Sequence, residues 1–169
     1  MRGAIFGDGA LVPGVTAVIA VLVVVVLVFR LGRRSGGQRR VASVQRLRPD
    51  AAVVLVSRTL ALDLAAEQLP AADGGATGDA GWEPGATTEV VASAGDDGLA
   101  LWLGAPGEMI PVVVAPPAHI RGAAVDGLAV TVTIATGGST VELPLAVVRR
   151  DSTLESWNAF TARLHALAA

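Results

Sequence analysis

Side chains that could do chemistry are few in this chain, and they are scattered. Asp96 and Asp97 form an adjacent pair of carboxylates, the residue type that general acid–base catalysis uses. They precede Gly98, and Asp-Gly is a strong signal for a tight hairpin turn. A solvated turn supplies neither the desolvation nor the charged partner that shifts a carboxyl pKa. We therefore interpret this pair as turn residues.

Other catalytic and metal-binding patterns are missing. His119 and His165 form no H-x-x-x-H pattern and the chain has no cysteine, so a zinc site is not expected. The absence of lysine excludes a P-loop, and no G-x-S-x-G occurs. His119 is either a contact in a strand-edge patch or an ordinary half-exposed strand residue, and His165 is a cation near a helix terminus. We predict no catalytic, cofactor or metal residues, and no enzyme.

The strongest feature is an uncharged stretch of 19 residues, Leu11–Phe29, rich in valine. As a helix it would be roughly 28 Å long, close to the hydrocarbon thickness of a bilayer. It is longer than the apolar part of a signal peptide, and no A-x-A-like cleavage site follows it. Such runs are rare in buried helices of water-soluble domains. We predict a single transmembrane helix over 11–31, preceded by a short extracytoplasmic segment, 1–10.

A dense arginine cluster follows the apolar run. Residues 30–48 contain seven arginines and no acid, whereas Arg2 and the α-amino group on the other flank are offset by Asp8. The positive-inside rule therefore places the C-terminal part in the cytoplasm. We predict an arginine-rich juxtamembrane linker over 32–49. The residues predicted to contact anionic lipid headgroups are Arg30, Arg33, Arg34, Arg39 and Arg40.

The remaining chain, 50–169, is long enough for one domain with its own core. Residues 51–169 carry five arginines against thirteen Asp and Glu, a net charge of −8. Such an acidic domain is a poor partner for nucleic acid, and an anionic lipid surface should repel it. The lack of cysteine fits a cytoplasmic location.

Strand signals dominate this domain. Ala51–Val56 indicates a buried strand, whereas Thr59–Leu69 fits a strand or a helix, and its alanine content favours a short helix. Residues 70–88 are predicted to be a flexible loop, in which Trp82 is either an anchor or an exposed indole. Pro144 requires its strand to lie at an edge or to carry a bulge. Further strands are predicted over 89–94, 99–103, 111–115, 119–125, 128–135 and 140–148.

A helix over 152–168 is predicted to end the pattern. Ser152 and Glu155 have the spacing of a capping box. Apolar residues then recur at three- and four-residue steps and form one stripe that should pack on the sheet. The stripe consists of Leu154, Trp157, Phe160, Leu164 and Leu167.

The segments His119–Val125, GLAVTVTIATGGSTVELPLAV and SWNAFTARLHAL together resemble the pleckstrin-homology-like (PH-like) fold, and most of all the small membrane-anchored PH-like proteins of actinobacteria. The resemblance implies an α+β domain, in which a C-terminal helix closes a partly open antiparallel β-barrel, and a binding role. Lipid-binding PH domains carry lysines and arginines after their first strand. Here that region offers Arg58 followed by Asp63 and Glu67, so phosphoinositide binding is not expected.

Two functions remain open at this point. The first is a single-pass, non-catalytic binding or scaffold module that presents its PH-like domain to the cytoplasm and to an unidentified protein partner. The second is an accessory subunit of a membrane transport or cell-envelope complex, recruited through its transmembrane helix. Neither function requires a cofactor.

Overall fold

The computed structural model describes residues 21–24, 36–69 and 88–169. The chain divides into two compact units, Met1–Ser35 and Gly36–Ala169. In the first unit only residues 21–24 are described, and they are helical with exposed side chains. Within the described ranges no helix is both long and apolar enough to cross a bilayer. Apart from 21–24, the run Leu11–Phe29 lies outside these ranges, so the transmembrane helix stays a prediction.

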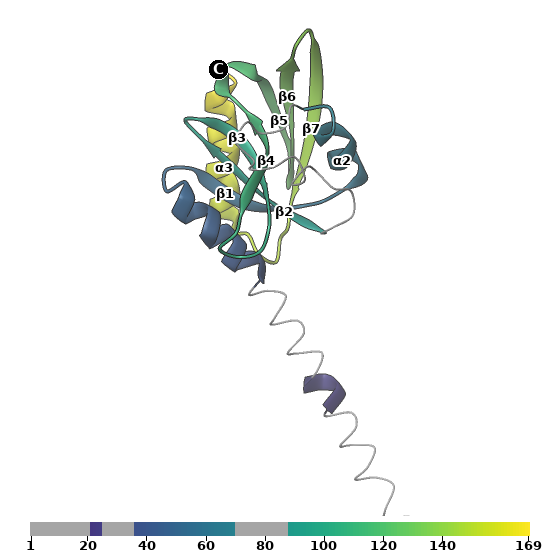
Figure 1. Cartoon of the computed structure of the whole chain (residues 1–169), viewed down its shortest axis with the longest axis vertical. Helices are drawn as coiled ribbons and strands as arrows, with labels where there is room; N and C mark the ends of the chain where they lie inside the picture. The colour runs from purple at the N-terminus through teal and green to yellow at the C-terminus, as the bar shows by residue number, and fades with distance from the viewer. Residues whose placement is uncertain (1–20, 25–35, 70–87) are drawn as a thin grey trace, which may run out of the picture. The chain divides into compact units, whose positions relative to one another are not determined.

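The second unit is an α+β domain with a seven-stranded antiparallel sheet and a C-terminal helix (Figure 1). The strand order is β4-β3-β2-β1-β7-β6-β5, so β4 and β5 form the two ends of an open sheet. The strands are β1 Ala52–Ser57, β2 Glu89–Gly95, β3 Gly98–Leu103, β4 Ile110–Ala115, β5 Ile120–Asp126, β6 Ala129–Thr136 and β7 Ser139–Val147. The helices are α2 Leu60–Ala66, the 3-10 turn η1 Pro117–His119 and α3 Leu154–Leu167, and residues 36–47 are also helical.

Turns that contain Asp-Gly form the two predicted hairpins. The turn at Asp96 and Asp97 joins β2 to β3, and Gly98 follows it with a φ of 107°. A side chain at Gly98 would collide with the carbonyl group of Ala115, so the position requires glycine for both its backbone angle and its space. The second Asp-Gly turn joins β5 to β6, as predicted.

One face of the sheet forms the main core, and α3 packs on it. Trp157, Phe160 and Leu164 of α3 are buried there, which confirms the central part of the predicted stripe. Two details of the prediction are wrong. Leu154 is 69% exposed, and the N-cap is Thr153, whose hydroxyl accepts from the Ser156 amide at 3.1 Å, instead of Ser152. Thr153 is as good a capping residue as Ser152, so the sequence alone did not distinguish them.

The opposite face of β1–β3 is covered by helix 36–47. Val44 of this helix is fully buried, and it belongs to a second core with Leu55, Val91, Trp102 and Met109. The compact unit therefore begins at Gly36, whereas the sequence placed 36–49 in a linker and began the domain at residue 50. Arginine-rich composition indicated a solvated neck, but the helix is amphipathic and its apolar residues cover the sheet.

Strand β7 lies inside the strand order, although Pro144 predicted an edge or a bulge. Only Ala146 and Val147 of β7 pair with β1, whereas Ser139–Ala146 pair with β6. Pro144 has no backbone N–H to donate, but it lies outside the two residues of β7 that pair with β1. No hydrogen bond between β1 and β7 is therefore lost. Helix α2, which confirms the helical interpretation of that segment, begins at the N-cap Thr59 and packs against β7.

The outer face of β5–β7 differs from that of β1–β3. Buried and half-exposed residues alternate along β6, where Val130, Val132 and Ile134 are buried and Thr131 and Thr133 lie on the opposite face. Such alternation is typical of a sheet with one solvated face. The two threonines keep part of their surface in water, so their hydroxyl groups need no buried partner.

Candidate functional site

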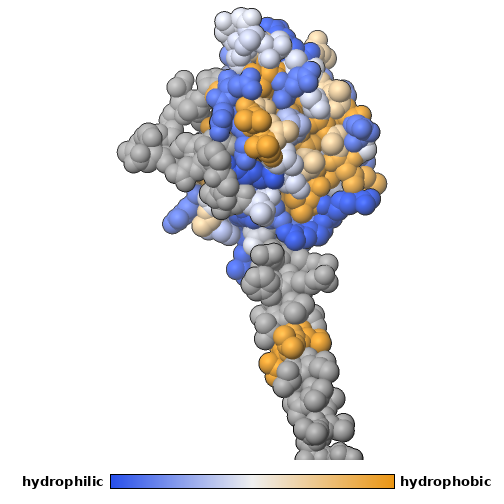
Figure 2. All heavy atoms as spheres, turned by 90° about the vertical axis from the view of Figure 1, so that its right-hand side faces the viewer, coloured by the Kyte–Doolittle hydropathy of each residue, from blue (hydrophilic) through white to orange (hydrophobic). Residues whose placement is uncertain are grey.

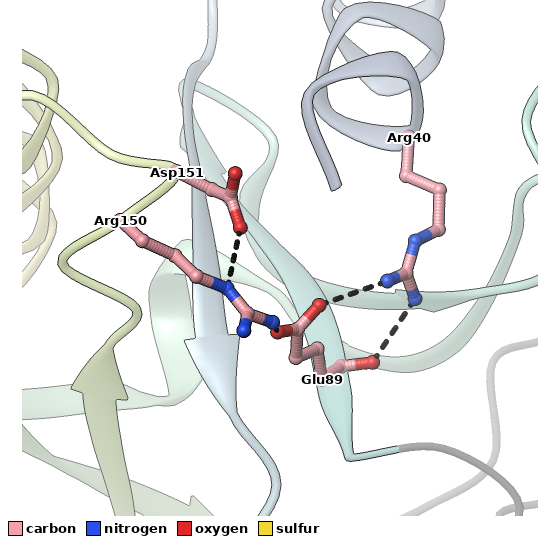
Figure 3. A network of polar contacts seen from close by, with 4 residues as sticks. All are labelled: Arg40, Glu89, Arg150 and Asp151. Carbon is pink, nitrogen blue, oxygen red and sulfur yellow. Dashed lines mark hydrogen bonds and ion pairs between the residues drawn. The ribbon is translucent and has the colours of Figure 1, made fainter. Parts of the chain in front are cut away.

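A network of charged side chains joins helix 36–47 to the sheet (Figure 3). Glu89, the first residue of β2, lies at its centre. The Arg40 guanidinium donates to the Glu89 carboxylate at 3.1 Å and to the Glu89 carbonyl oxygen at 3.3 Å. Arg150, between β7 and α3, binds the other oxygen of the same carboxylate and donates to Asp151 at 3.1 Å. Three segments that are distant in the sequence therefore meet at one carboxylate.

Burial makes this network different from an ordinary surface ion pair. The Glu89 side chain is 10% exposed and that of Asp151 is 0% exposed, whereas that of Arg150 keeps 44% of its surface in solvent. The hydrogen bond to Asp151, followed by the negative charge of Glu89, raises the pKa of Arg150. Both oxygens of the buried Glu89 carboxylate are bound by guanidinium groups. Such a group positions segments and is poorly suited to proton transfer.

A second polar contact fixes the other end of helix 36–47. Ser93 is fully buried in β2, and its hydroxyl oxygen accepts from Trp102 Nε1 and from Arg48, both at 2.8 Å. Arg48 also pairs with Asp97, and burial lowers the pKa of Arg48 from its ordinary value. The guanidinium still carries its charge near neutral pH. The two ends of the helix are thus each attached to β2 through a buried polar side chain.

The arginine after the first strand is also used within the domain. The Arg58 side chain is 2% exposed and its Nε donates to Asp63 of α2 at 2.6 Å. A guanidinium in this position is turned away from solvent, and the carboxylate beside it would repel a phosphate. Arg58 therefore presents its guanidinium to the domain rather than to a ligand in solvent.

The predicted lipid-contact residues separate into three groups. Arg30, Arg33 and Arg34 lie outside the described residues. Arg39 is exposed on helix 36–47, where its guanidinium can reach a ligand. Arg40, one residue further on, is 18% exposed and holds Glu89. The helix therefore turns one arginine outward and commits the next to the domain, a difference that charge counting does not detect.

The other titratable candidates lie apart from this network. Asp96 pairs with Arg163 of α3 at 3.1 Å and is 89% exposed, which agrees with the turn interpretation. His119 and His165 are both exposed, at the end of η1 and in the last turn of α3. In the described ranges no group of three or more His, Cys, Asp or Glu is arranged to hold a metal ion.

Exposed hydrophobic side chains occur on the side of the molecule that carries α2 and β7. Figure 2, which faces this side, shows hydrophobic residues at the surface among hydrophilic ones. Helix α2 contributes Leu60 and Leu64, which are 75% and 53% exposed, while Leu62 between them is buried. Isolated exposed leucines of this kind are common on soluble domains.

Sequence reasoning missed the residues that build the network. Glu89 and Ser93 are single polar residues inside the apolar run EVVASA, and a polar residue in a buried strand requires a partner. That signal indicated that partners exist, but it did not identify them. In comparisons with protein-family models, curated proteins and solved structures, no match to this chain was found.

Proposed function

We propose that this protein is a single-pass, membrane-anchored binding or scaffold module that presents a PH-like domain to the cytoplasm. The observation that carries the proposal is the uncharged run Leu11–Phe29, directly followed by an arginine cluster and then by a compact unit that begins at Gly36. A bilayer-length apolar segment is best accommodated as a spanning helix, and the arginines favour the cytoplasmic side for the domain behind them.

The fold supports the PH-like part of the proposal. Strands β1–β4 and β5–β7 each follow one another as an antiparallel meander, β1 and β7 meet in the middle of the order, and β4 and β5 form its two ends. A C-terminal helix packs against β1, β2 and β5. This arrangement is what a partly open barrel closed by one helix requires, and the resemblance found in the sequence implies the same fold.

The chemistry of the domain supports a binding role rather than a catalytic one. The buried charged side chains described above, Glu89 and Asp151, are bound by arginines that connect segments of the fold. Carboxylates bound in this way hold segments of the fold together. A partner could instead bind at the exposed surface of the domain or at the two edge strands, β4 and β5.

Topology is the first test. The natural chain has no cysteine, so a single cysteine introduced at Leu60, a position that is 75% exposed, reports the location of the domain. We expect a membrane-impermeant maleimide to label this variant only after permeabilisation of the cells. Labelling of intact cells would place the domain outside and overturn the proposed orientation.

The second test separates the binding module from the alternative accessory subunit. One variant keeps residues 1–35 and lacks the domain, and a matched variant keeps residues 36–169 behind an unrelated transmembrane helix. We expect co-purifying proteins to follow the domain. If they follow residues 1–35 instead, the accessory-subunit function replaces the one proposed.

A further inference from the structure

We propose that the loop between β7 and α3 docks on the phospholipid surface, with Arg149 at a lipid phosphate and Leu154 inserted among the headgroups. This inference rests on the proposed function, because it assumes that residues 11–29 span the membrane. It adds a second lipid contact, made by the folded domain itself, at a place that the sequence did not indicate.

A small cavity lies at this loop. Its volume is about 240 Å³, and it combines one cation and hydroxyl-bearing residues with apolar side chains. Arg149 is exposed, whereas its neighbour Arg150 is bound by Glu89 and Asp151. The residues that line the cavity are Leu128, Val147, Arg149, Ser152, Thr153, Leu154 and Trp157. A guanidinium beside an apolar wall suits an amphiphile whose charged group is a phosphate.

Leu154 adds an exposed apolar side chain to the same loop. Its side chain is 69% exposed although it begins an otherwise well-packed helix. Exposed leucine next to arginine is the combination found where peripheral segments enter the headgroup region, since the leucine gains from leaving water and the arginine from the phosphates. Glu155, the next residue, is also exposed and works against binding, so the arginines must supply the attraction.

Chain connectivity allows this loop to reach the bilayer. Six residues, 30–35, separate Phe29 from Gly36, so the chain allows at most about 25 Å between them. Gly37 in turn touches the loop, because a Cβ built there would lie 3.1 Å from Asp151 Oδ2. Within the domain, helix 36–47 and α3 begin at the same end (Figure 1). If Phe29 ends a spanning helix, this length of chain allows residues 149–154 to reach the lipid surface.

The charge of the domain does not contradict this placement. The domain is acidic as a whole, and an anionic surface repels most of it. At the loop, however, arginines neutralise the carboxylates of Glu89 and Asp151, while Arg39 and Arg149 remain exposed. Repulsion of the remaining surface and attraction at this loop therefore favour the same orientation.

The test uses the full-length chain in vesicles of phosphatidylcholine mixed with phosphatidylglycerol. A single cysteine at Leu154 carries an environment-sensitive fluorophore, and doxyl-labelled lipids quench it when it enters the bilayer. Leu60→Cys is the matched control, since Leu60 is also an exposed leucine at the start of a helix, at 75% against 69%. We expect strong quenching at position 154 and none at position 60.

Charge reversal tests the role of Arg149. In the labelled Leu154→Cys background, Arg149→Glu should lower the ratio of docked to undocked domain about thirtyfold, because it changes the local charge by two and each charge contributes about 1 kcal/mol at an anionic surface. Arg121→Glu, at an exposed arginine of β5, makes the same change in net charge and should leave the quenching unaltered.

Vesicle flotation separates the possible failures. If the chain floats with the vesicles but positions 154 and 60 are quenched equally, the docking inference is wrong and the membrane anchor stands. If the chain does not float with these vesicles, the proposed anchor fails, and the docking inference fails with it. If Arg121→Glu weakens quenching as much as Arg149→Glu, net charge rather than this loop controls the position of the domain.

Discussion

The two halves of the sheet differ in whether their outer faces are covered. The outer face of β1–β3 carries large apolar residues such as Leu55 and Trp102, and helix 36–47 covers it. The outer face of β5–β7 carries small and polar residues such as Gly122 and Thr133, and they remain half-exposed. One continuous sheet thus has a two-sided core in one half and a one-sided core in the other.

This difference explains where the arginine-rich segment belongs. A sheet face with Leu55 and Trp102 exposed would be unstable in water, since burial of such side chains contributes about 2–3 kcal/mol each. Helix 36–47 covers that face and removes these side chains from water. Hydrogen bonds from Arg40 to Glu89 and from Arg48 to Ser93 hold the helix on β2. The domain therefore begins at the arginines rather than after them, which brings its fold to within a few residues of the predicted membrane helix.

The largest expected effect is at Trp102. Trp102→Ala removes a side chain that is 8% exposed between sheet and helix, together with its hydrogen bond to Ser93. We expect the free energy of unfolding to fall by about 3–5 kcal/mol, measured by urea denaturation of the full-length chain followed by far-UV circular dichroism. Thr133→Ala on the open face should change it by less than about 0.5 kcal/mol. Equal losses at both positions would remove the distinction between the two faces.

The buried network comes next. Glu89→Gln leaves Arg40 and Arg150 without their shared carboxylate, and we expect a loss of about 2 kcal/mol, less than for a fully buried pair because Arg150 is 44% exposed. Glu142→Gln is the matched control in β7, where the carboxylate is exposed, and should be close to neutral. The measurement is again the urea transition, and a neutral Glu89→Gln would show that the network does not hold the helix.

Ser93 allows a test of the other attachment. Ser93→Ala leaves two donors, Trp102 Nε1 and the Arg48 guanidinium, without their buried acceptor. We expect about 1–2 kcal/mol of destabilisation, with a weaker signal of tryptophan near-UV dichroism. Ser139→Ala, at the exposed start of β7, removes a hydroxyl that water can replace. If both serines tolerate alanine equally, the buried acceptor contributes nothing beyond packing.

The smallest effect concerns two glycines. A Cβ at Gly37 would lie 2.9 Å from Leu55 Cδ2, so Gly37→Ala requires the buried Leu55 side chain to shift, and we expect about 1 kcal/mol of destabilisation despite the better helix propensity of alanine. At Gly122 a Cβ meets Thr133 at an ordinary 3.7 Å, and Gly122→Ala should be neutral or slightly stabilising. Thermal unfolding midpoints compare the two, and stabilisation by Gly37→Ala would mean that the helix packs more loosely than described.

Much of the domain was predictable because its signals are local. The Asp-Gly turns, the alternation along β6 and the apolar repeat of α3 each depend on residues within a few positions of one another. The exact cap of α3 was not predictable, because Ser152 and Thr153 are both good capping residues and only the path of the chain decides between them. The role of Arg40 was not predictable either, since charge alone does not say which way a side chain points.

By itself, the sequence determined the apolar run and the charge asymmetry between the arginine cluster and the acidic domain. It also determined the succession of strands and C-terminal helix along the chain, because composition and periodicity act over short distances. The tertiary structure alone decided which face of the sheet helix 36–47 covers and which carboxylate its arginine finds. Arg40 and Glu89 are 49 residues apart, and Glu89 and Arg150 are 61 apart. Such pairings follow from the packing of the whole sheet, and no local pattern encodes them.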